Sequence, residues 1–131
     1  LDMAQPPALH RQPPSESRET ARVNTPSPNL ALQIRLPQGH KLNPNANSQV
    51  RLTMQGATVQ GKAELVLPIE ALQMSLPLQL TAERATLTLH LLIYHCREGQ
   101  EGLCYLYEKR ITLPIQQGTG ADTVPVEVVV E

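Results

Sequence analysis

The sequence predicts an all-β fold, and three observations lead to this expectation. Several segments alternate apolar and polar residues with the period of two that is typical of a strand with one buried face. Leu precedes Pro four times, and each such proline is expected to mark a strand end, a bulge or a sheet edge. No long window has a convincing helical period of 3.6. Roughly seven or eight short strands over about 100 residues favour an immunoglobulin-like antiparallel β-sandwich.

The N-terminal segment has a different composition. Residues 1–29 contain six of the twelve prolines and no sustained apolar pattern. A segment of this kind buries too little apolar surface to offset the entropy of ordering, which is typical of a flexible linker. We therefore expect a Pro-rich flexible linker over residues 1–29 and a β-sandwich domain over residues 30–131. Because Leu1 is not an initiator Met, we expect the chain to be part of a longer protein.

The strands of the expected sandwich can be placed in order along the chain. The first is expected at residues 30–36, and a turn rich in Asn, Pro and Gly separates it from a second at QVRLTM. The segment IEALQM between Pro68 and Pro77 is the candidate for a short helical turn. Further strands are expected around Thr58 and Val59, at residues 62–67, at residues 76–81 and at residues 124–130.

Residues 85–115 give the clearest strand signal, and they contain both cysteines and all three tyrosines. Two alternating runs flank REGQEG, a polar segment with glycines that is typical of a turn. If Cys96 lies opposite Cys104, then Leu89 lies opposite Ile111 on one apolar face. A one-residue slip would move every apolar side chain to the wrong face, so the pattern and the cysteines independently predict the same hairpin register.

Opposed residues of an antiparallel pair have Cα atoms about 4.5 to 5.5 Å apart, within the range that a disulfide spans. We therefore infer a Cys96–Cys104 bond. As a structural staple it would contribute about 2.5 kcal/mol in the chain-entropy model. As an exchangeable disulfide it would use sulfurs on a polar face beside a flexible turn, and free thiols are a third interpretation. The pair is not a CxxC motif, so activation would depend on Arg97 or on loop groups.

Other chemistries find little support in the sequence. His90 and Cys96 lie six residues apart along one strand face, roughly 20 Å in an extended chain, so they cannot share a metal ion. His40 is expected in a solvated turn. Ser48 and Ser75 have no recognisable base and acid near them. We expect no metal and no cofactor.

Charge and hydropathy exclude two classes of partner. The net charge is −1 with a pI near 6.5, and the basic residues are scattered, so neither nucleic acid nor an anionic membrane is an expected partner. No apolar run approaches the roughly 20 residues of a spanning helix, and no apolar export segment is visible at the N-terminus. Since Phe and Trp are missing from the sequence, the core is expected to consist of Leu, Val, Ile and Ala, with the tyrosines as its only large anchors.

Three segments, GHKLNPNANSQV, AELVLPI and LIYHCREGQEGLCYLYEKRITLPI, carry a family resemblance. They resemble the C-terminal β-domain of suppressor-of-quenching-like proteins, which join a thioredoxin-like domain to an NHL-repeat propeller. In that family a Tyr-rich strand runs into the first Cys, a polar turn follows, and the second Cys opens a strand that ends in Leu-Pro. The matching positions here are Tyr94, Cys96, Cys104 and Pro114, and the resemblance covers about residues 30–115.

The hairpin is also similar to the N-terminal periplasmic domain of the thiol:disulfide interchange protein DsbD, an immunoglobulin-like sandwich with a redox-active cysteine pair. Together the resemblances imply thiol–disulfide exchange through Cys96 and Cys104, with Tyr94, Arg97 and Tyr105 as candidate binding residues. The implied partners are the NHL propeller and thioredoxin-like domain of the same protein, or a client protein. An oxidising compartment such as the periplasm or thylakoid lumen is implied, with the cytoplasm as an alternative. The competing function is a non-catalytic structural or protein-binding sandwich with a structural disulfide.

Overall fold

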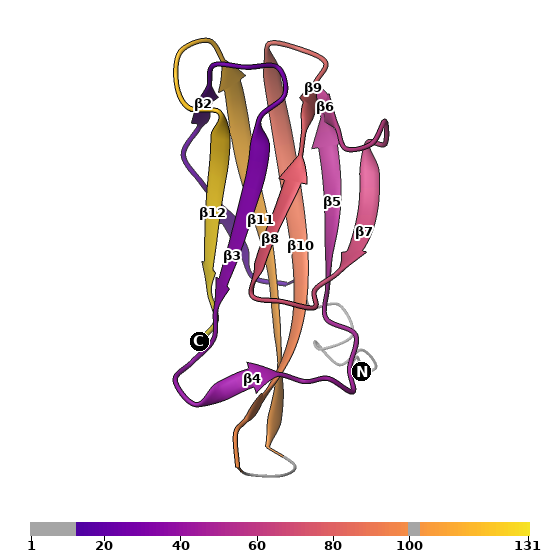
Figure 1. Cartoon of the computed structure of the whole chain (residues 1–131), viewed down its shortest axis with the longest axis vertical. Helices are drawn as coiled ribbons and strands as arrows, with labels where there is room; N and C mark the ends of the chain where they lie inside the picture. The colour runs from indigo at the N-terminus through magenta and orange to yellow at the C-terminus, as the bar shows by residue number, and fades with distance from the viewer. Residues whose placement is uncertain (1–12, 100–102) are drawn as a thin grey trace, which may run out of the picture.

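The computed structural model describes residues 13–99 and 103–131, which form two layers of β-sheet packed face to face (Figure 1). The prediction of an all-β sandwich is confirmed. Within the described ranges there is no helix long and apolar enough to cross a membrane. The strands, in chain order, are β1 (Ser15–Ser17), β2 (Ala21–Val23), β3 (Asn29–Arg35), β4 (His40–Leu42), β5 (Gln49–Gln55), β6 (Ala57–Thr58), β7 (Glu64–Pro68), β8 (Gln73–Pro77), β9 (Gln79–Leu80), β10 (Arg84–Arg97), β11 (Cys104–Gln117) and β12 (Thr123–Val129).

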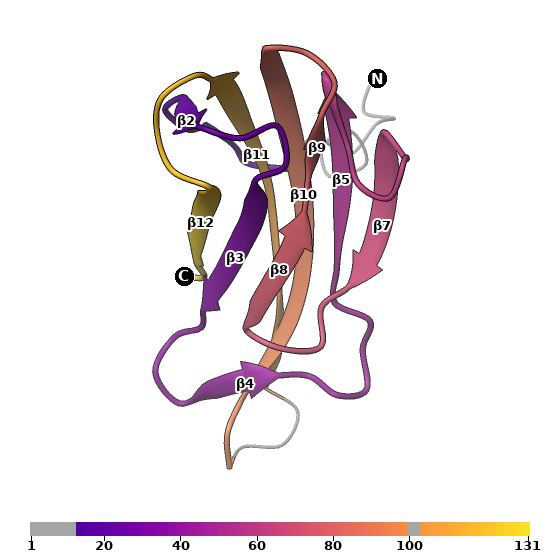
Figure 2. The ribbon, with the colours of Figure 1, turned by 45° about the horizontal axis from the view of Figure 1, so that its top comes forward.

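The larger layer follows the order β1-β11-β10-β5-β7, with β2 also paired to β11 and β4 also paired to β10. The smaller layer has the order β12-β3-β8 and lies across the face of the larger one (Figure 2). Strands β6 and β9 form a separate two-stranded pair. The strands of five or more residues are β3, β5, β7, β8, β10, β11 and β12, which agrees with the expected seven or eight.

The sheets are mixed, which differs from the purely antiparallel arrangement that the sequence suggested. Strands β1 and β2 both run parallel to β11, and β12 runs parallel to β3. The reason for the difference is that alternation of apolar residues predicts which face of a strand is buried and carries no information about strand direction. Direction depends on connections between strands that are far apart in the chain.

The sheet begins earlier than the sequence suggested. Strands β1 and β2 lie within the segment that we expected to be linker, and the Val23 side chain is fully buried in the core. The polar strand β1 is held by backbone pairing to β11 and by ion pairs from Glu16 to Arg18 and Lys109. Apolar alternation cannot reveal a strand of this kind. Residues 1–12 of the expected linker lie outside the described residues.

Proline positions shape the sheet edges as expected. Pro37 follows β3, and Pro68 and Pro77 are the last residues of β7 and β8, which are both edge strands. The expected helical turn in IEALQM is wrong. Ile69 instead extends the ladder of β7 by donating its amide hydrogen to the Ser48 carbonyl at 2.8 Å, and the chain then crosses to the other sheet as β8.

Pro114 lies inside β11, at the gap between the two N-terminal strands. Amides of odd-numbered residues face β10 in this ladder, as shown by the 2.8 Å bond from Gln117 to the Glu83 carbonyl. The nitrogen of Pro114 therefore faces outward. Strand β1 pairs with residues 110–112 and β2 with residues 115–117, so neither strand pairs with Pro114. The proline has no amide hydrogen to donate, and at this position no hydrogen bond is lost.

The core between the layers is aliphatic, as the composition predicted, but the tyrosines are not its large anchors: Tyr107 packs against its edge and Tyr105 is exposed. Strand β10 contributes every second residue to it, and Leu87, Leu89, Leu91 and Ile93 are each fully buried. The facing layer contributes Leu30, Leu32, Ile34, Val124, Val126 and Val128. Toward one end of the hairpin the inner face continues with His95 on β10 and with Lys109, Tyr107 and Tyr105 on β11, so the core becomes polar there.

Candidate functional site at the hairpin tip

Strands β10 and β11 are the longest in the molecule and extend beyond the ends of β3, β5 and β12 to the level of β4, as Figure 1 shows. Their register is the predicted one throughout, with Leu89 opposite Ile111 and Cys96 opposite Cys104. A disulfide bond joins the two cysteines, whose Cα atoms are 4.0 Å apart. Cross-strand pairing therefore brings the sulfur atoms together at the projecting end of the hairpin, and the inferred bond is confirmed.

The two halves of the disulfide have different surroundings. Cys96 is 8% exposed, because β10 is flanked by β11 on one side and by β4 on the other. Cys104 is exposed, since it lies on β11 ahead of Arg110, where the pairing with β1 begins. Among the described residues, no strand pairs with the outer edge of β11 from Cys104 to Lys109. Cys96 is thus buried, whereas Cys104 is exposed to solvent.

Strand β4 places a cation beside the sheltered cysteine. Lys41 lies directly opposite Cys96 in the β4–β10 pair, so the two side chains share one face of the sheet. The Lys41 side chain is exposed. Neither sequence alternation nor the cysteine spacing pointed to this residue, because its position depends on the pairing of a three-residue strand from a distant loop.

The distinctive Asn-Pro-Asn-Ala loop joins β4 to β5 and supports the hairpin. The Tyr94 amide donates to the buried Ser48 Oγ at 2.9 Å, and the Tyr94 carbonyl accepts from the Asn43 amide at 2.9 Å. Asn43 Oδ1 also accepts from the Asn45 amide, which fixes the turn. The loop therefore fills the gap along β10 between its partners β5 and β4.

The three candidate binding residues do not lie together. Tyr94 is half-buried on the same sheet face as the cysteines. Tyr105 is opposite His95 and lies on the other face, where it is 46% exposed. Arg97 is exposed and lies opposite His40, also on the face away from the disulfide. Beside Tyr94, the disulfide face carries Leu106, which is 52% exposed and was not predicted as a site residue.

A histidine pair occupies the face behind the disulfide. His40 Nδ1 and His95 Nδ1 are 2.8 Å apart, and the Tyr105 ring stacks on His95 with a centroid separation of 5.6 Å. His95 is 4% exposed, and burial together with the charge of His40 lowers the pKa of its imidazole. The expectation that His40 lies in a solvated turn is wrong, because His40 begins strand β4 and is half-buried. The two histidines are 55 residues apart in sequence, so no local pattern predicts their contact.

Ionic groups surround the hairpin further from its tip. Glu108 lies 2.6 Å from His90 on the disulfide face. On the opposite side, Lys109 hydrogen-bonds Glu16 at 2.8 Å, which lowers the pKa of that carboxyl and raises the pKa of the lysine. Burial raises the pKa of Tyr107. In the described part of the chain none of these groups contacts the sulfur atoms. They contribute to the charge of the surface and have no direct contact with the disulfide.

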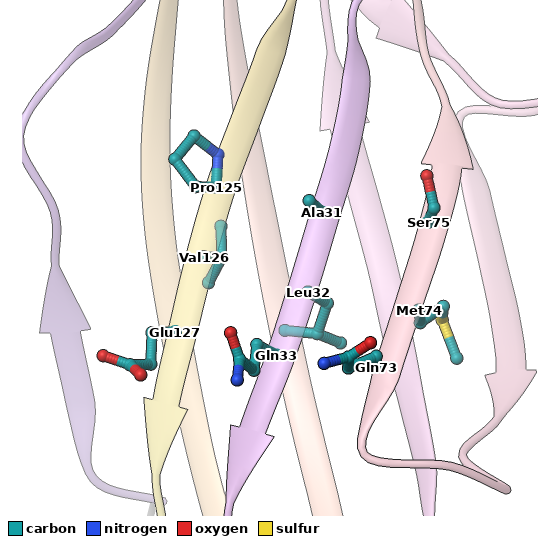
Figure 3. Close-up of a pocket in the computed structure, with 9 residues that line it drawn as sticks. All are labelled: Ala31, Leu32, Gln33, Gln73, Met74, Ser75, Pro125, Val126 and Glu127. Carbon is teal, nitrogen blue, oxygen red and sulfur yellow. The ribbon is translucent and has the colours of Figure 1, made fainter.

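A hollow of about 520 Å³ lies on the outer face of the smaller sheet, away from the hairpin tip. Figure 3 shows the Gln73 amide reaching from β8 toward β3 and the Gln33 amide reaching from β3 toward β12, with Ala31 and Ser75 one step further along the strands. Glu127 on β12 completes the polar row. The hollow has a floor of small side chains and contains no nucleophile with an adjacent base.

The two serines that were considered as nucleophiles occupy unrelated positions. The Ser48 hydroxyl is engaged by the Tyr94 amide, and Ser75 lines the outer hollow. Across residues 13–99 and 103–131 no three His, Cys, Asp or Glu side chains gather in a geometry that could hold a metal ion.

Comparison with protein-family models finds none that matches this sequence, and comparison with curated proteins finds no significant match. The geometry of the molecule therefore carries the functional argument. The structure defines a β-sandwich whose longest hairpin ends in a cross-strand disulfide between the buried Cys96 and the exposed Cys104.

Proposed function

We propose that the chain takes part in thiol–disulfide exchange through the Cys96–Cys104 pair. The observation that carries the proposal is the asymmetry of the bond. Cys104 is exposed on the outer strand of a projecting hairpin, whereas Cys96 is sheltered between two strands. An incoming thiolate must approach along the line of the S–S bond, and only the Cys104 side offers an open approach.

The exchange begins with a partner thiolate that attacks Cys104 Sγ. A bond forms between the partner sulfur and Cys104, the Cys96–Cys104 bond breaks, and its electron pair leaves on Cys96 as a thiolate. A second thiolate of the partner then attacks the partner's own sulfur in the mixed disulfide and releases Cys104. The partner becomes a disulfide, and this chain becomes a dithiol that has gained two electrons and, after protonation, two protons.

Lys41 supports the departure of Cys96. A thiolate beside a cation has a lowered pKa and leaves faster than one in neutral surroundings. Because Lys41 lies opposite Cys96 on the same face, its ammonium group is available to the developing charge. Lys41 takes the role that was expected of Arg97, because the position of Arg97 in the strand directs it to the other face.

The family resemblance of the sequence suggests the context of this exchange. In that architecture the domain is the C-terminal accessory part of a thioredoxin-like/NHL-repeat protein, and the partner dithiol belongs to the thioredoxin-like domain or to a client protein. A hairpin that extends beyond β3, β5 and β12 fits this role (Figure 1), because it carries the disulfide to one end of the sandwich, where a partner could approach it.

The second candidate is a structural or protein-binding sandwich in which the same disulfide only fastens the hairpin. The low exposure of Cys96 favours it. The tip lies outside the aliphatic core, so a covalent link there compensates for missing apolar contacts.

The reduction potential of the pair discriminates between the two functions. Equilibration of the protein in graded thiol buffers, followed by alkylation and mass measurement, gives this potential. A value between about −270 and −120 mV, the range of exchange proteins, supports the proposal. A value below about −300 mV identifies a structural disulfide and overturns it.

Two single-cysteine variants test which sulfur is attacked. Cys96→Ser leaves the exposed thiol of Cys104, and Cys104→Ser leaves the sheltered thiol of Cys96. We expect the Cys96→Ser variant to form a mixed disulfide with oxidised glutathione about tenfold faster or more, because access limits the reaction. Equal rates, or faster reaction at Cys96, would contradict attack at Cys104.

A further inference from the structure

The His40–His95 contact is a side-chain tie between β4 and the hairpin. Strand β4 has three residues, and its pairing with β10 spans only the positions of His95, Cys96 and Arg97. Two further backbone bonds flank it, from the Asn43 amide to the Tyr94 carbonyl and from the Glu98 amide to the Gly39 carbonyl. So short an edge strand has little cooperative stability of its own, and side-chain contacts decide whether it stays in place.

The protonation states of the two rings determine whether this tie can exist. A hydrogen bond between two Nδ1 atoms needs one nitrogen that carries a proton and one that accepts it. This is satisfied when both imidazoles are neutral and when only one of them is protonated. When both are protonated, two N–H groups and two positive charges face each other over 2.8 Å, and the bond is lost.

No described carboxylate forms an ion pair with either histidine. On β10, Arg97 lies opposite His40 and adds positive charge to the same face. On β11, Tyr105 covers His95 with its ring, and on β4 the neighbouring Lys41 is directed to the other face. Glu98, beyond the end of β10, contributes its amide to the Gly39 carbonyl. The second proton therefore meets an environment that is already positive.

We propose that the His40–His95 pair is a pH-operated latch, which holds β4 over the Cys96 side of the hairpin at neutral pH and releases it when both rings are protonated. Burial lowers the pKa of His95, so the second proton binds below the ordinary histidine value of about 6.5. Release of β4 uncovers Cys96 and moves Lys41 away from it. The latch acts on the backbone of β4, so it does not depend on whether the disulfide exchanges.

Amide hydrogen exchange of the oxidised, ¹⁵N-labelled chain tests the latch. Protection factors, which correct for the intrinsic effect of pH, are compared at pH 7.5 and pH 5.5. We expect the Asn43 and Glu98 amides to lose protection about tenfold or more at the lower pH, the effect of one pKa unit in one histidine. The Ile69 and Met54 amides, which bond to other parts of the sheet, should keep theirs.

Two variants separate the latch from general acid sensitivity. In His40→Asn the side-chain oxygen of the new residue can accept a hydrogen bond from the His95 ring, whether that ring is neutral or protonated. The contact between β4 and β10 then survives at both pH values, so the Asn43 amide should stay protected. His90→Gln, on the same strand but bonded to Glu108, should lose protection as the wild type does. The same pH-dependent loss in His40→Asn and in the wild type would overturn the proposal.

A direct titration keeps the test decisive if His40→Asn does not fold. The ring signals of His40 and His95 in the wild type report each protonation step by NMR. The proposal requires that Asn43 lose its protection in step with the second protonation of the pair. Loss at another pH, or constant protection through that step, would refute it.

Discussion

The inner and outer halves of the β10–β11 hairpin are continuous in backbone but are held by different forces. In the inner half, Leu89 and its neighbours are fully buried between two sheets, and packing supplies the stability. In the outer half the facing sheet has ended, and a disulfide, a histidine pair and a loop serine replace the apolar contacts. One pair of strands thus has a base that is stabilised by packing and a tip that is held by a disulfide and by polar side-chain contacts.

The largest expected effect lies in the inner half. Leu89→Ala removes a fully buried side chain that pairs with Leu52 and Ile111, so the free energy of unfolding should fall by about 2 to 5 kcal/mol. Urea unfolding followed by circular dichroism measures the loss. Leu106→Ala, on the same hairpin but 52% exposed, is the control and should change stability by less than about 0.5 kcal/mol. An equal loss of stability in the two variants would show that packing does not distinguish the inner half of the hairpin from the outer half.

A smaller loss is expected at the tip when its covalent tie is removed. The double substitution of Cys96 and Cys104 by Ser should lower the free energy of unfolding by about 2.5 kcal/mol in the chain-entropy model. The same urea experiment on the wild type with a reducing agent should reproduce the loss, and the double variant should not respond to that agent. Unchanged stability of the reduced wild type would show that the tip is held without its disulfide.

Ser48 lies at the junction between the halves. Its substitution should lower the free energy of unfolding less than Leu89→Ala does and more than the loss of a surface ion pair does. Ser48→Ala leaves the Tyr94 amide without its partner in a buried position, at a cost of about 1 to 3 kcal/mol. Thermal unfolding of the variant measures this cost. Ser75→Ala, on the outer face of the smaller sheet, should be nearly neutral. A neutral Ser48→Ala would mean that the loop does not support the hairpin.

The smallest effect is expected for the surface pair that ties β1 to β11. The pKa of Glu16 is lowered by its hydrogen bond from Lys109, so the stabilisation exists above the unfolded carboxyl pKa of about 4.3 and is lost as pH falls below it. Glu16→Gln should cost at most about 1 kcal/mol at pH 7 and nothing once the carboxyl is protonated. Urea unfolding at both pH values measures the difference, and a loss that persists at low pH would assign the effect to packing.

The predictable part of the fold is the part that apolar alternation encodes. Register in the hairpin followed from Leu89, Ile111 and the two cysteines, because a slip would expose the core face. The disulfide followed from the same register. The prolines after Leu67 and Leu76 correctly marked the ends of edge strands.

The rest depends on contacts between distant polar segments. Strand β1 has no apolar alternation, so composition predicted a linker where the backbone in fact pairs with β11. The contact of His40 with His95 and the position of Lys41 both require the pairing of β4 to β10, which only the folded chain defines. The sequence therefore predicted the disulfide pair. The groups that give the two cysteines different surroundings, such as Lys41, are recognised only in the three-dimensional structure.

The interruption of the N-terminal strand at Pro114 has a mechanical consequence. A force applied to the chain ahead of β1 acts first on three residues of backbone pairing and the ion pairs of Glu16. Because Pro114 separates β1 from β2, rupture of the first strand does not propagate directly into the second. Val23, fully buried at the end of β2, then provides a separate point of resistance. The N-terminal strands are therefore expected to detach from β11 in two steps, and the first step can reverse while the sandwich remains intact.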